Sequence, residues 1–353
     1  MGHDRRAAPR QRVRMADVAA AAGVSRATVS RVLSGDPAVI EPTAAAVRAV
    51  IERLGYRPDL AAQALMGTSR TLGVLFGEPP ARASAGLLAG IHDAATSNGY
   101  TITVAIATDR EGMQLRRGLD AMIDQRVAAA IVLPATERNA EILAEADMPF
   151  PVVSTTDLGV GFPLSIAALD ERGAVDVIMT HLQEIGRTRI LHISDRPDTI
   201  VSQIRHAGWA ARVRDPDLYQ TSNEWSADAG HEALHRAIAR GVRPDAVFAA
   251  SDDLALGALR AAAELHLRVP EDLAIAGFGG FPITAYYGPG LTTMATDLHE
   301  RGRLAVEECL RRLANPAGPP MRHVLPAQLV IRGSTISLSE STSPTYGSVR
   351  KAT

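Results

Sequence analysis

From Thr71 onward, short apolar segments alternate with segments of helical periodicity, and this alternation constrains the fold more than any other feature. The apolar segments are TLGVLF (71–76), TITVAIA (101–107), AAAIVL (128–133), PVVST (151–155), ILHIS (190–194), AVFAAS (246–251) and LAIAGFG (273–279). Because these strands are apolar at nearly every position, helices must cover both faces of the sheets, which is typical of parallel α/β folds. About ten strands over some 265 residues favour two doubly wound lobes over one sheet, with a ligand cleft at the strand carboxyl ends.

The segment before Thr71 has helical rather than strand periodicity. It predicts a first helix at 15–22, which Gly23 is suited to end in the left-handed conformation. Ser25 offers an N-cap for a second helix, and a third helix is expected at about 42–54. The short joint AAAGVS between the first two helices is typical of a helix-turn-helix.

The second helix has two chemically different faces. Its apolar stripe consists of Val29, Val32 and Leu33. Its opposite face consists of Arg26, Ala27, Ser30 and Arg31. The stripe is suited to packing against neighbouring helices, and the polar face is either a solvated surface or a ligand reader.

Charge is unevenly distributed along the chain. The whole chain has a net charge of −2, whereas residues 1–70 contain eleven arginines and six acidic residues and carry a net charge of +5. The remaining 283 residues carry a net charge of −7. A small basic module that precedes a larger acidic one indicates attraction to nucleic acid phosphates at the N-terminal end.

Several classes of protein are not expected. The N-terminal segment MGHDRRAAPRQRVR has positive charge without the apolar stretch of a signal peptide, and no segment approaches the roughly 18 to 20 apolar residues of a membrane span. We therefore expect a cytoplasmic protein without a membrane partner. Cys309 is the single cysteine, which excludes an intrachain disulfide and a cysteine-cluster metal site, and we expect it to be buried. No cofactor is expected.

Two parts of the sequence resemble one known family. DVAAAAGVSRATVSRVLSG and the following VRAVIERLGYRPDLAAQAL resemble the DNA-binding headpiece and hinge of the lactose-repressor (LacI/GalR) family of bacterial transcription regulators. HLQEIGRTRILHIS, RPDAVFAASDDLALGALRA, VPEDLAIAGFGGF and PGLTTMATDL resemble the core of that family, in the expected order. The resemblance extends over residues 14–336, nearly the whole chain.

This resemblance implies an α/β fold with an N-terminal all-α helix-turn-helix headpiece and hinge helix, followed by a two-lobe core like that of periplasmic binding proteins, built from doubly wound parallel sheets. The expected parts are a basic flexible arm (1–14), a headpiece (15–57), a hinge helix and linker (58–70), an effector-binding and dimerisation core (71–336) and a disordered tail (337–353). The N-lobe is expected at 71–168 and 297–326, and the C-lobe at 169–296 and 327–336.

The resemblance implies that the second helix reads DNA in the major groove. Arg26 and Ala27 would lie near base edges, and Arg31 is suited to bidentate contact with guanine. Hydroxyl side chains would contact phosphates; these are Ser25, Thr28, Ser30 and Ser34. Ala27 stands where the family often has a longer polar residue, so we expect one base pair to be read by apolar contact alone.

DLAAQAL resembles the hinge helix that pairs with its dimer mate in the minor groove. Ala62 and Leu65 would lie at the DNA, with Leu65 inserted at the central base step. The segment is too short to be a stable helix alone, so it is expected to fold only when a partner holds it. Asp59 stands where the family usually has Asn, and its charge is expected to weaken binding to phosphates.

The resemblance also implies a small effector, a sugar or related metabolite, between the lobes. The expected contact residues are Thr156, Arg205, Trp225, Ser251, Asp253 and Gly279. Arg205 would donate to effector hydroxyls or carboxylates, and Trp225 would stack on the effector. Gly279 and Gly280 replace an acidic residue that the family often has, and Asp252 is expected to be a structural helix cap.

These features together predict a sequence-specific DNA-binding transcription regulator, a repressor, that acts as a homodimer on a near-palindromic double-stranded operator. Its operator affinity would be controlled by the effector.

Two other functions are compatible with parts of the sequence. HEALH (231–235) matches the H-E-x-x-H motif of zinc metalloproteases, but no third-ligand motif follows, so neither a metal nor an enzyme is expected. A periplasmic sugar-binding protein would share the two-lobe core, but it has no use for the helices at 15–67.

Overall fold

The computed structural model describes residues 13–34, 36, 38–54, 56, 69–78, 82–109, 111–222, 224–337 and 349–351. The chain divides into two compact units, Met1–Arg70 and Thr71–Thr353. The predicted hinge helix, with Ala62 and Leu65, lies outside the described residues, as does most of the predicted arm.

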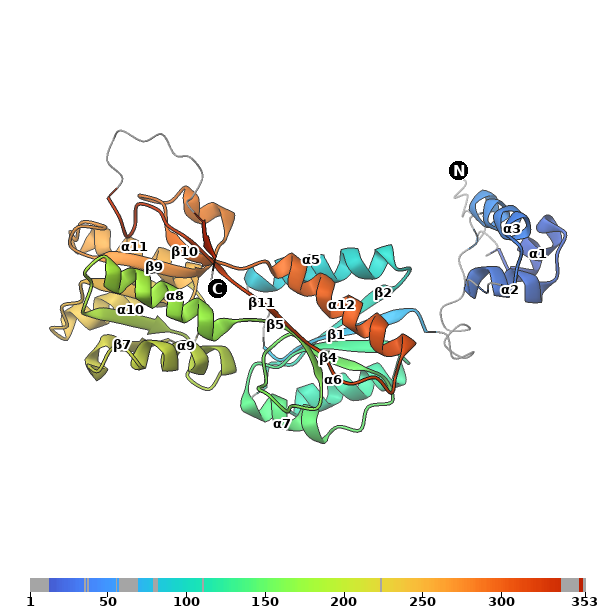
Figure 1. Cartoon of the computed structure of the whole chain (residues 1–353), viewed down its shortest axis with the longest axis horizontal. Coiled ribbons are helices and arrows are strands. Elements are labelled where there is room, and N and C mark those ends of the chain that lie inside the picture. The colour runs from blue at the N-terminus through green and yellow to red at the C-terminus, as the bar shows by residue number, and fades with distance from the viewer. Residues whose placement is uncertain are drawn as a thin grey trace, which may run out of the picture. The chain divides into compact units, whose positions relative to one another are not determined.

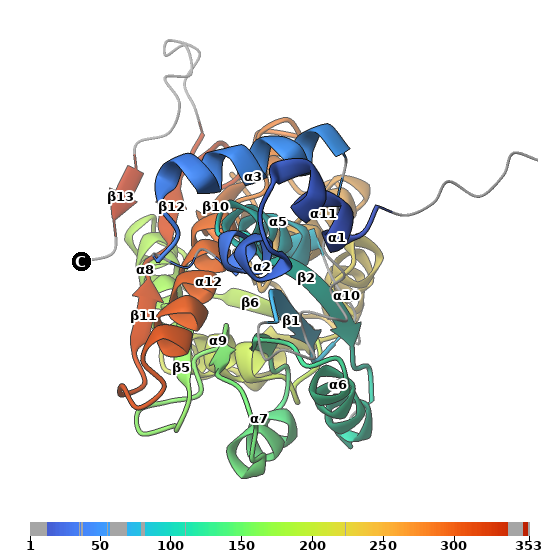
Figure 2. The same cartoon turned by 90° about the vertical axis from the view of Figure 1, so that its right-hand side faces the viewer.

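The described residues of the first unit form a cluster of three helices: α1 (Met15–Ala22), α2 (Arg26–Ser34) and α3 (Glu41–Leu54), which can be followed in Figure 2. Val18, Val29 and Val47 are fully buried, one from each helix, and hold the cluster together. Gly23 ends α1 with a φ of 65°, a left-handed conformation that an L side chain rarely adopts. The predicted helix-turn-helix is therefore present, and α3 begins one residue before the predicted start.

The second unit contains two sheets. The first has six strands in the order β11-β5-β4-β3-β1-β2, all parallel. Its strands are β1 (Thr71–Phe76), β2 (Thr101–Ile106), β3 (Ala129–Leu133), β4 (Val152–Ser154), β5 (Ser165–Leu169) and β11 (Arg322–Leu325). Helices α5 (Arg82–Ser97) and α12 (Leu298–Ala314) cover one face, and α6 (Met113–Asp124) and α7 (Glu137–Glu145) cover the other (Figures 1 and 2).

The second sheet has seven strands in the order β13-β12-β10-β9-β8-β6-β7. Its strands are β6 (Ile190–Ser194), β7 (Tyr219–Thr221), β8 (Ala246–Ala249), β9 (Ala274–Gly279), β10 (Thr292–Ala295), β12 (Gln328–Val330) and β13 (Val349–Lys351). The helices of this lobe are α8 (Glu171–Glu184), α9 (Ile200–Ala210), α10 (Ala227–Ala239) and α11 (Asp252–Glu264), with short 3₁₀ turns at Pro216–Leu218 and Pro282–Ala285 (Figure 1). Strands β6 to β10 are parallel, whereas β12 pairs antiparallel with β10.

Part of the predicted disordered tail, Val349–Lys351, is extended. These residues form β13, which pairs antiparallel with β12. The edge of β12 offers unpaired backbone N–H and C=O groups that a short segment can satisfy. Residues 338–348, also in the predicted tail, lie outside the described residues.

The predicted fold class is confirmed, and the chain passes between the two lobes three times. The connections follow β5, follow β10, and join β11 to β12. Cys309 is fully buried, as expected, and burial raises the pKa of its thiol. No helix among the described residues is both long enough and apolar enough to span a membrane.

Candidate functional site

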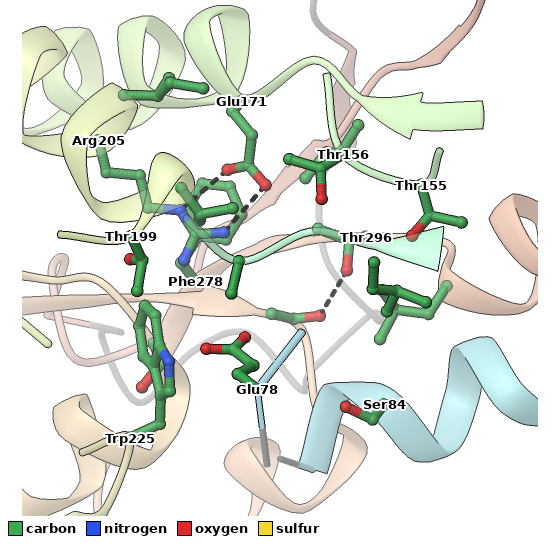
Figure 3. A pocket seen from close by; sticks show the side chains of 18 of the residues that line it. Glu78, Ser84, Thr155, Thr156, Glu171, Thr199, Arg205, Trp225, Phe278 and Thr296 are labelled. Carbon is green, nitrogen blue, oxygen red and sulfur yellow. Dashed lines mark hydrogen bonds and ion pairs between the residues drawn. The ribbon is translucent and has the colours of Figure 1, made fainter. Parts of the chain in front are cut away.

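A cavity of about 170 Å³ lies between the two lobes of the second unit (Figure 3). Its walls come from residues at or just beyond strand carboxyl ends: Glu78 after β1, Thr156 after β4, Glu171 after β5, Ser251 after β8 and Thr296 after β10. The carboxyl ends of parallel strands in two doubly wound sheets therefore face one another across the cavity. This is the place where such folds bind small ligands.

The cavity brings together all six residues that the sequence predicts at the effector site. They are Thr156, Arg205, Trp225, Ser251, Asp253 and Gly279. Trp225 and Arg205 come from the second lobe, and Thr156 comes from the first (Figure 3). Both lobes thus contribute polar groups to one cavity.

Several N–H groups of the Arg205 guanidinium already donate hydrogen bonds to other residues of the protein. Its Nε donates to Oε2 of Glu171 at 2.9 Å, its Nη2 donates to Oε1 at 3.1 Å, and its Nη1 donates to the carbonyl of Ala250. The guanidinium carbon lies 3.8 Å from the centre of the Phe278 ring. Both side chains of the ion pair are only 10% exposed, so Arg205 and Glu171 form a fixed, charge-balanced element of the wall. Within the described part of the chain, two of the five N–H groups of Arg205 remain for a ligand.

Two further ionisable groups line the cavity and were not predicted. Burial, together with nearby Asp195, raises the pKa of Glu78 to about 7. Burial lowers the pKa of Arg301 to about 10, and the buried Nε of Arg301 has no hydrogen-bond partner among the described residues. A ligand with oxygen acceptors would satisfy that donor.

Glu78, Glu171 and Arg301 gave no recognisable motif in the sequence. Glu78 and Glu171 each stand two residues after the end of a buried strand, a position that in this fold class faces the ligand. That placement was the available signal. Arg301 lies on α12, which reaches the cavity only because the chain returns from the second lobe to the first after β10.

The loop of Gly279 and Gly280 has a backbone reason for its glycines. Their φ values are 141° and 74°, and a Cβ atom on Gly280 would lie 2.5 Å from Cα of Ala295. The fully buried carboxylate of Asp252 braces this loop, accepting the N–H of Phe281 at 2.8 Å. Asp252 is structural as expected, but it is not the helix cap: Ser251 Oγ caps α11 by accepting the N–H of Leu254 at 3.2 Å.

Helix α2 of the first unit presents the predicted polar face to solvent. Arg26, Ala27 and Arg31 are exposed, whereas Val29 is buried. Ser25 Oγ accepts the N–H of Thr28 at 3.0 Å, so Ser25 caps the helix as predicted. Arg31 forms a loose ion pair with Asp36, with 3.8 Å between Nε and Oδ2. Ser30 is half-buried, and the side chain of Ser34 lies outside the described part of the chain.

The combination of a helix-turn-helix unit and a two-lobe unit with an interlobe cavity defines a DNA-binding regulator that senses a small molecule. Comparison with known proteins agrees. Residues 14–59 match the family described as bacterial regulatory proteins, lacI family, and residues 179–335 match the periplasmic binding protein-like domain. The transcriptional regulator MalR of Streptomyces coelicolor is 33% identical over 92% of this chain and 97% of its own length. The chain belongs to the lacI family.

Solved structures of relatives have the same fold. The lac repressor dimer bound to operator and the anti-inducer ONPF has a TM-score of 0.81 and 26% identity, covering 93% of this chain and 100% of that chain. The complex of the transcriptional regulator CelR with cellobiose has a TM-score of 0.67 and 28% identity, covering 92% and 100%. The relatives are transcription regulators, not enzymes.

Replacing Glu78 with glutamine should stabilise the protein at alkaline pH. A carboxyl whose pKa is raised in the folded state stabilises that state fully below its ordinary pKa of 4.5, and this contribution is lost as the pH rises towards 7. At about pH 8 the free energy of unfolding of Glu78→Gln should exceed that of the wild type by roughly 1 to 3 kcal/mol. Urea unfolding of both proteins across this pH range measures the difference. A difference that does not change with pH would contradict the raised pKa.

Proposed function

We propose that the protein is a repressor that binds a near-palindromic operator as a homodimer, in the cytoplasm where its DNA lies. Its effector is a sugar or related polyhydroxylated metabolite bound between the lobes. The observation that carries this proposal is that one cavity is lined by all six predicted contact residues: Thr156, Arg205, Trp225, Ser251, Asp253 and Gly279. CelR with cellobiose and the operator-bound lac repressor dimer are relatives with such ligands and partners.

The lining chemistry fits a ligand that has both apolar faces and hydroxyl groups. Trp225 and Phe278 offer aromatic surfaces, while Asp253 and Glu78 offer carboxyl groups. Arg301 offers a donor that the described residues leave unsatisfied. Aromatic stacking combined with charged hydrogen-bonding groups is a usual way to bind polar rings in a mostly enclosed site.

Effector and operator are coupled through the hinge segments. When the effector closes the lobes, the two hinges of the dimer change their spacing and no longer fold together in the minor groove, so operator affinity falls. Operator DNA must in turn weaken effector binding by the same factor. In this proposal Ala62 and Leu65 contact the minor groove, with Leu65 inserted at the central base step.

The major groove is read by α2. Arg26, Ala27 and Arg31 lie at base edges, and the hydroxyl side chains of Ser25, Thr28, Ser30 and Ser34 contact phosphates. The exposure of Arg26, Ala27 and Arg31 supports this assignment. Because Ser25 Oγ also caps the helix, its phosphate contact would use the hydroxyl hydrogen or a second lone pair.

The test begins with selection of operator sequences from random duplex DNA by the full-length protein. Fluorescence anisotropy then measures operator affinity in the presence of mono- and disaccharides, sugar phosphates, nucleosides and small acids. We expect a palindromic consensus and at least one sugar-type compound that changes operator affinity about 5- to 150-fold. Selection without a consensus would refute the regulator, and a purely nucleoside or acid response would refute the sugar effector.

Replacing Arg31 with alanine should weaken binding to the selected operator by about 1 to 3 kcal/mol and relax the preference at one base pair, because a bidentate guanine contact is lost. Arg48→Ala is the matched control, since Arg48 is an exposed arginine of α3 that pairs with Glu41. Affinities for operator, single-base variants and random duplexes measure the effect. An equal loss on random DNA would assign Arg31 to a phosphate.

A further inference from the structure

The H-E-x-x-H segment of α10 meets a third potential metal ligand in space. His231 and His235 lie one turn apart, with ring centres 4.5 Å from each other. Nε2 of His231 lies 2.7 Å, and Nε2 of His235 lies 3.1 Å, from the same Oε2 atom of Glu264. Glu264 is the last residue of α11, 29 residues beyond His235, so no sequence motif revealed it.

Two glycines fix the helices that carry these residues. A Cβ atom on Gly230 of α10 would lie 2.0 Å from the carbonyl oxygen of Leu254. A Cβ atom on Gly257 of α11 would lie 1.8 Å from the carbonyl oxygen of Ala227. The backbones of α10 and α11 are therefore in direct contact, which places the last turn of α11 beside the two histidines. The three donors come from rigid elements rather than from loops.

We propose that His231, His235 and Glu264 bind a divalent transition metal ion, preferably zinc. The ligand atoms are Nε2 of each histidine and Oε2 of the glutamate, and water is the fourth ligand. Two imidazoles and one carboxylate are a usual protein ligand set for zinc. Tetrahedral zinc with bonds of about 2.1 Å separates its ligand atoms by roughly 3.4 Å. The present N–O distances of 2.7 and 3.1 Å need only a small opening of the cluster.

The surroundings favour metal entry and a fixed carboxylate. The side chains of His231, His235 and Glu264 are 33%, 36% and 37% exposed, so solvent reaches all three. Nε of Arg260 donates to Oε1 of Glu264 at 2.7 Å, which leaves Oε2 for the histidines. His231, Arg260 and His235 thus all converge on this one carboxylate.

The site differs from a hydrolytic zinc centre. The glutamate of the motif, Glu232, is largely exposed and lies 3.5 Å from Nη1 of Arg236 on the next turn. Glu232 is also not one of the three clustered donors, so it does not have the place of the glutamate that activates water in a hydrolytic centre. The metal acts as a clip between α10 and α11 and stabilises the second lobe through its binding free energy.

The experiment uses full-length protein stripped of metal with a chelator and titrated with zinc chloride against a chromophoric zinc indicator at neutral pH. We expect one tight site per chain, whose affinity falls at least about 30-fold in His231→Ala, His235→Ala and Glu264→Gln, because each removes a ligand. His299→Ala is the matched control, since His299 pairs with Asp93 at 3.0 Å outside the cluster of three donors. The His299→Ala variant should bind zinc with the same affinity as the wild type.

Two further measurements guard against misfolded variants. Circular dichroism verifies the folding of each variant, and zinc should raise the melting temperature of the wild type and of His299→Ala but not that of Glu264→Gln. Cobalt(II) should bind to the wild type with the intense visible absorption of a tetrahedral ion. The proposal is overturned if the wild type binds no stoichiometric zinc, or if folded Glu264→Gln and His231→Ala bind zinc as tightly as the wild type does.

Discussion

Replacing Arg205 with alanine should lower the free energy of unfolding of the two-lobe unit by about 3 to 5 kcal/mol, because it leaves a buried charge without its partner. The carboxylate of Glu171 is 10% exposed and receives two hydrogen bonds from Arg205. The variant also loses the contact of the guanidinium with the Phe278 ring. Urea unfolding at neutral pH, followed by circular dichroism, measures the loss.

A double variant separates the charge effect from the packing effect. Glu171→Leu combined with Arg205→Met removes both charges and keeps apolar volume, so it should recover most of the stability that Arg205→Ala loses. It should nevertheless fail to respond to the effector, because the wall has lost the N–H groups that Arg205 keeps available for a ligand. A stable, fully responsive Arg205→Ala protein would show that the ion pair contributes neither to the fold nor to the site.

Replacing Gly257 with alanine should lower the free energy of unfolding by about 3 kcal/mol. Alanine is favoured over glycine inside a helix by about 1 kcal/mol, so propensity alone predicts the opposite sign. The steric term dominates, since the added methyl group would lie 1.8 Å from the carbonyl oxygen of Ala227 and 2.6 Å from the backbone nitrogen of His231. Backbone atoms at both points cannot rotate away, so α10 and α11 must separate.

Gly86→Ala is the matched control for Gly257→Ala. Gly86 also lies inside a helix, α5, but its Cβ would meet the side chain of Leu298 at 3.2 Å. The propensity gain and the mild contact nearly cancel, so we expect a change within about 1 kcal/mol in either direction. Thermal and urea unfolding of both variants provide the comparison. If Gly257→Ala is as stable as the wild type, the helices tolerate separation, and the close approach has no structural importance.

The sequence predicted strands well where a segment is apolar at nearly every position. The seven apolar segments chosen as strands all contain strands, because residues such as Val74, Ile131 and Phe248 are buried on both faces of a parallel sheet. Strand β10 was not predicted, since its segment begins with the polar residues Thr292 and Thr293 and is not an apolar run. They are buried because their hydroxyls bond to Thr335 and Asp252, which are distant in sequence.

The candidate sites show the same dependence on distant contacts. The family resemblance correctly placed Thr156, Ser251 and Gly279 at the cavity, because these positions follow recognisable sequence segments. The resemblance could not reveal that Glu171 forms an ion pair with the guanidinium of Arg205. Nor could it supply Glu264, which joins the histidines only through the packing of two helices.

The three passages of the chain between the lobes limit how the cavity can change. Sliding or separation of the lobes would stretch covalent backbone at three places, after β5, after β10 and between β11 and β12. A hinge rotation of one lobe relative to the other needs changes in only a few backbone dihedral angles of these connections. The two lobes can therefore rotate relative to each other more easily than they can slide or separate. The size of a bound molecule then sets the angle between the lobes.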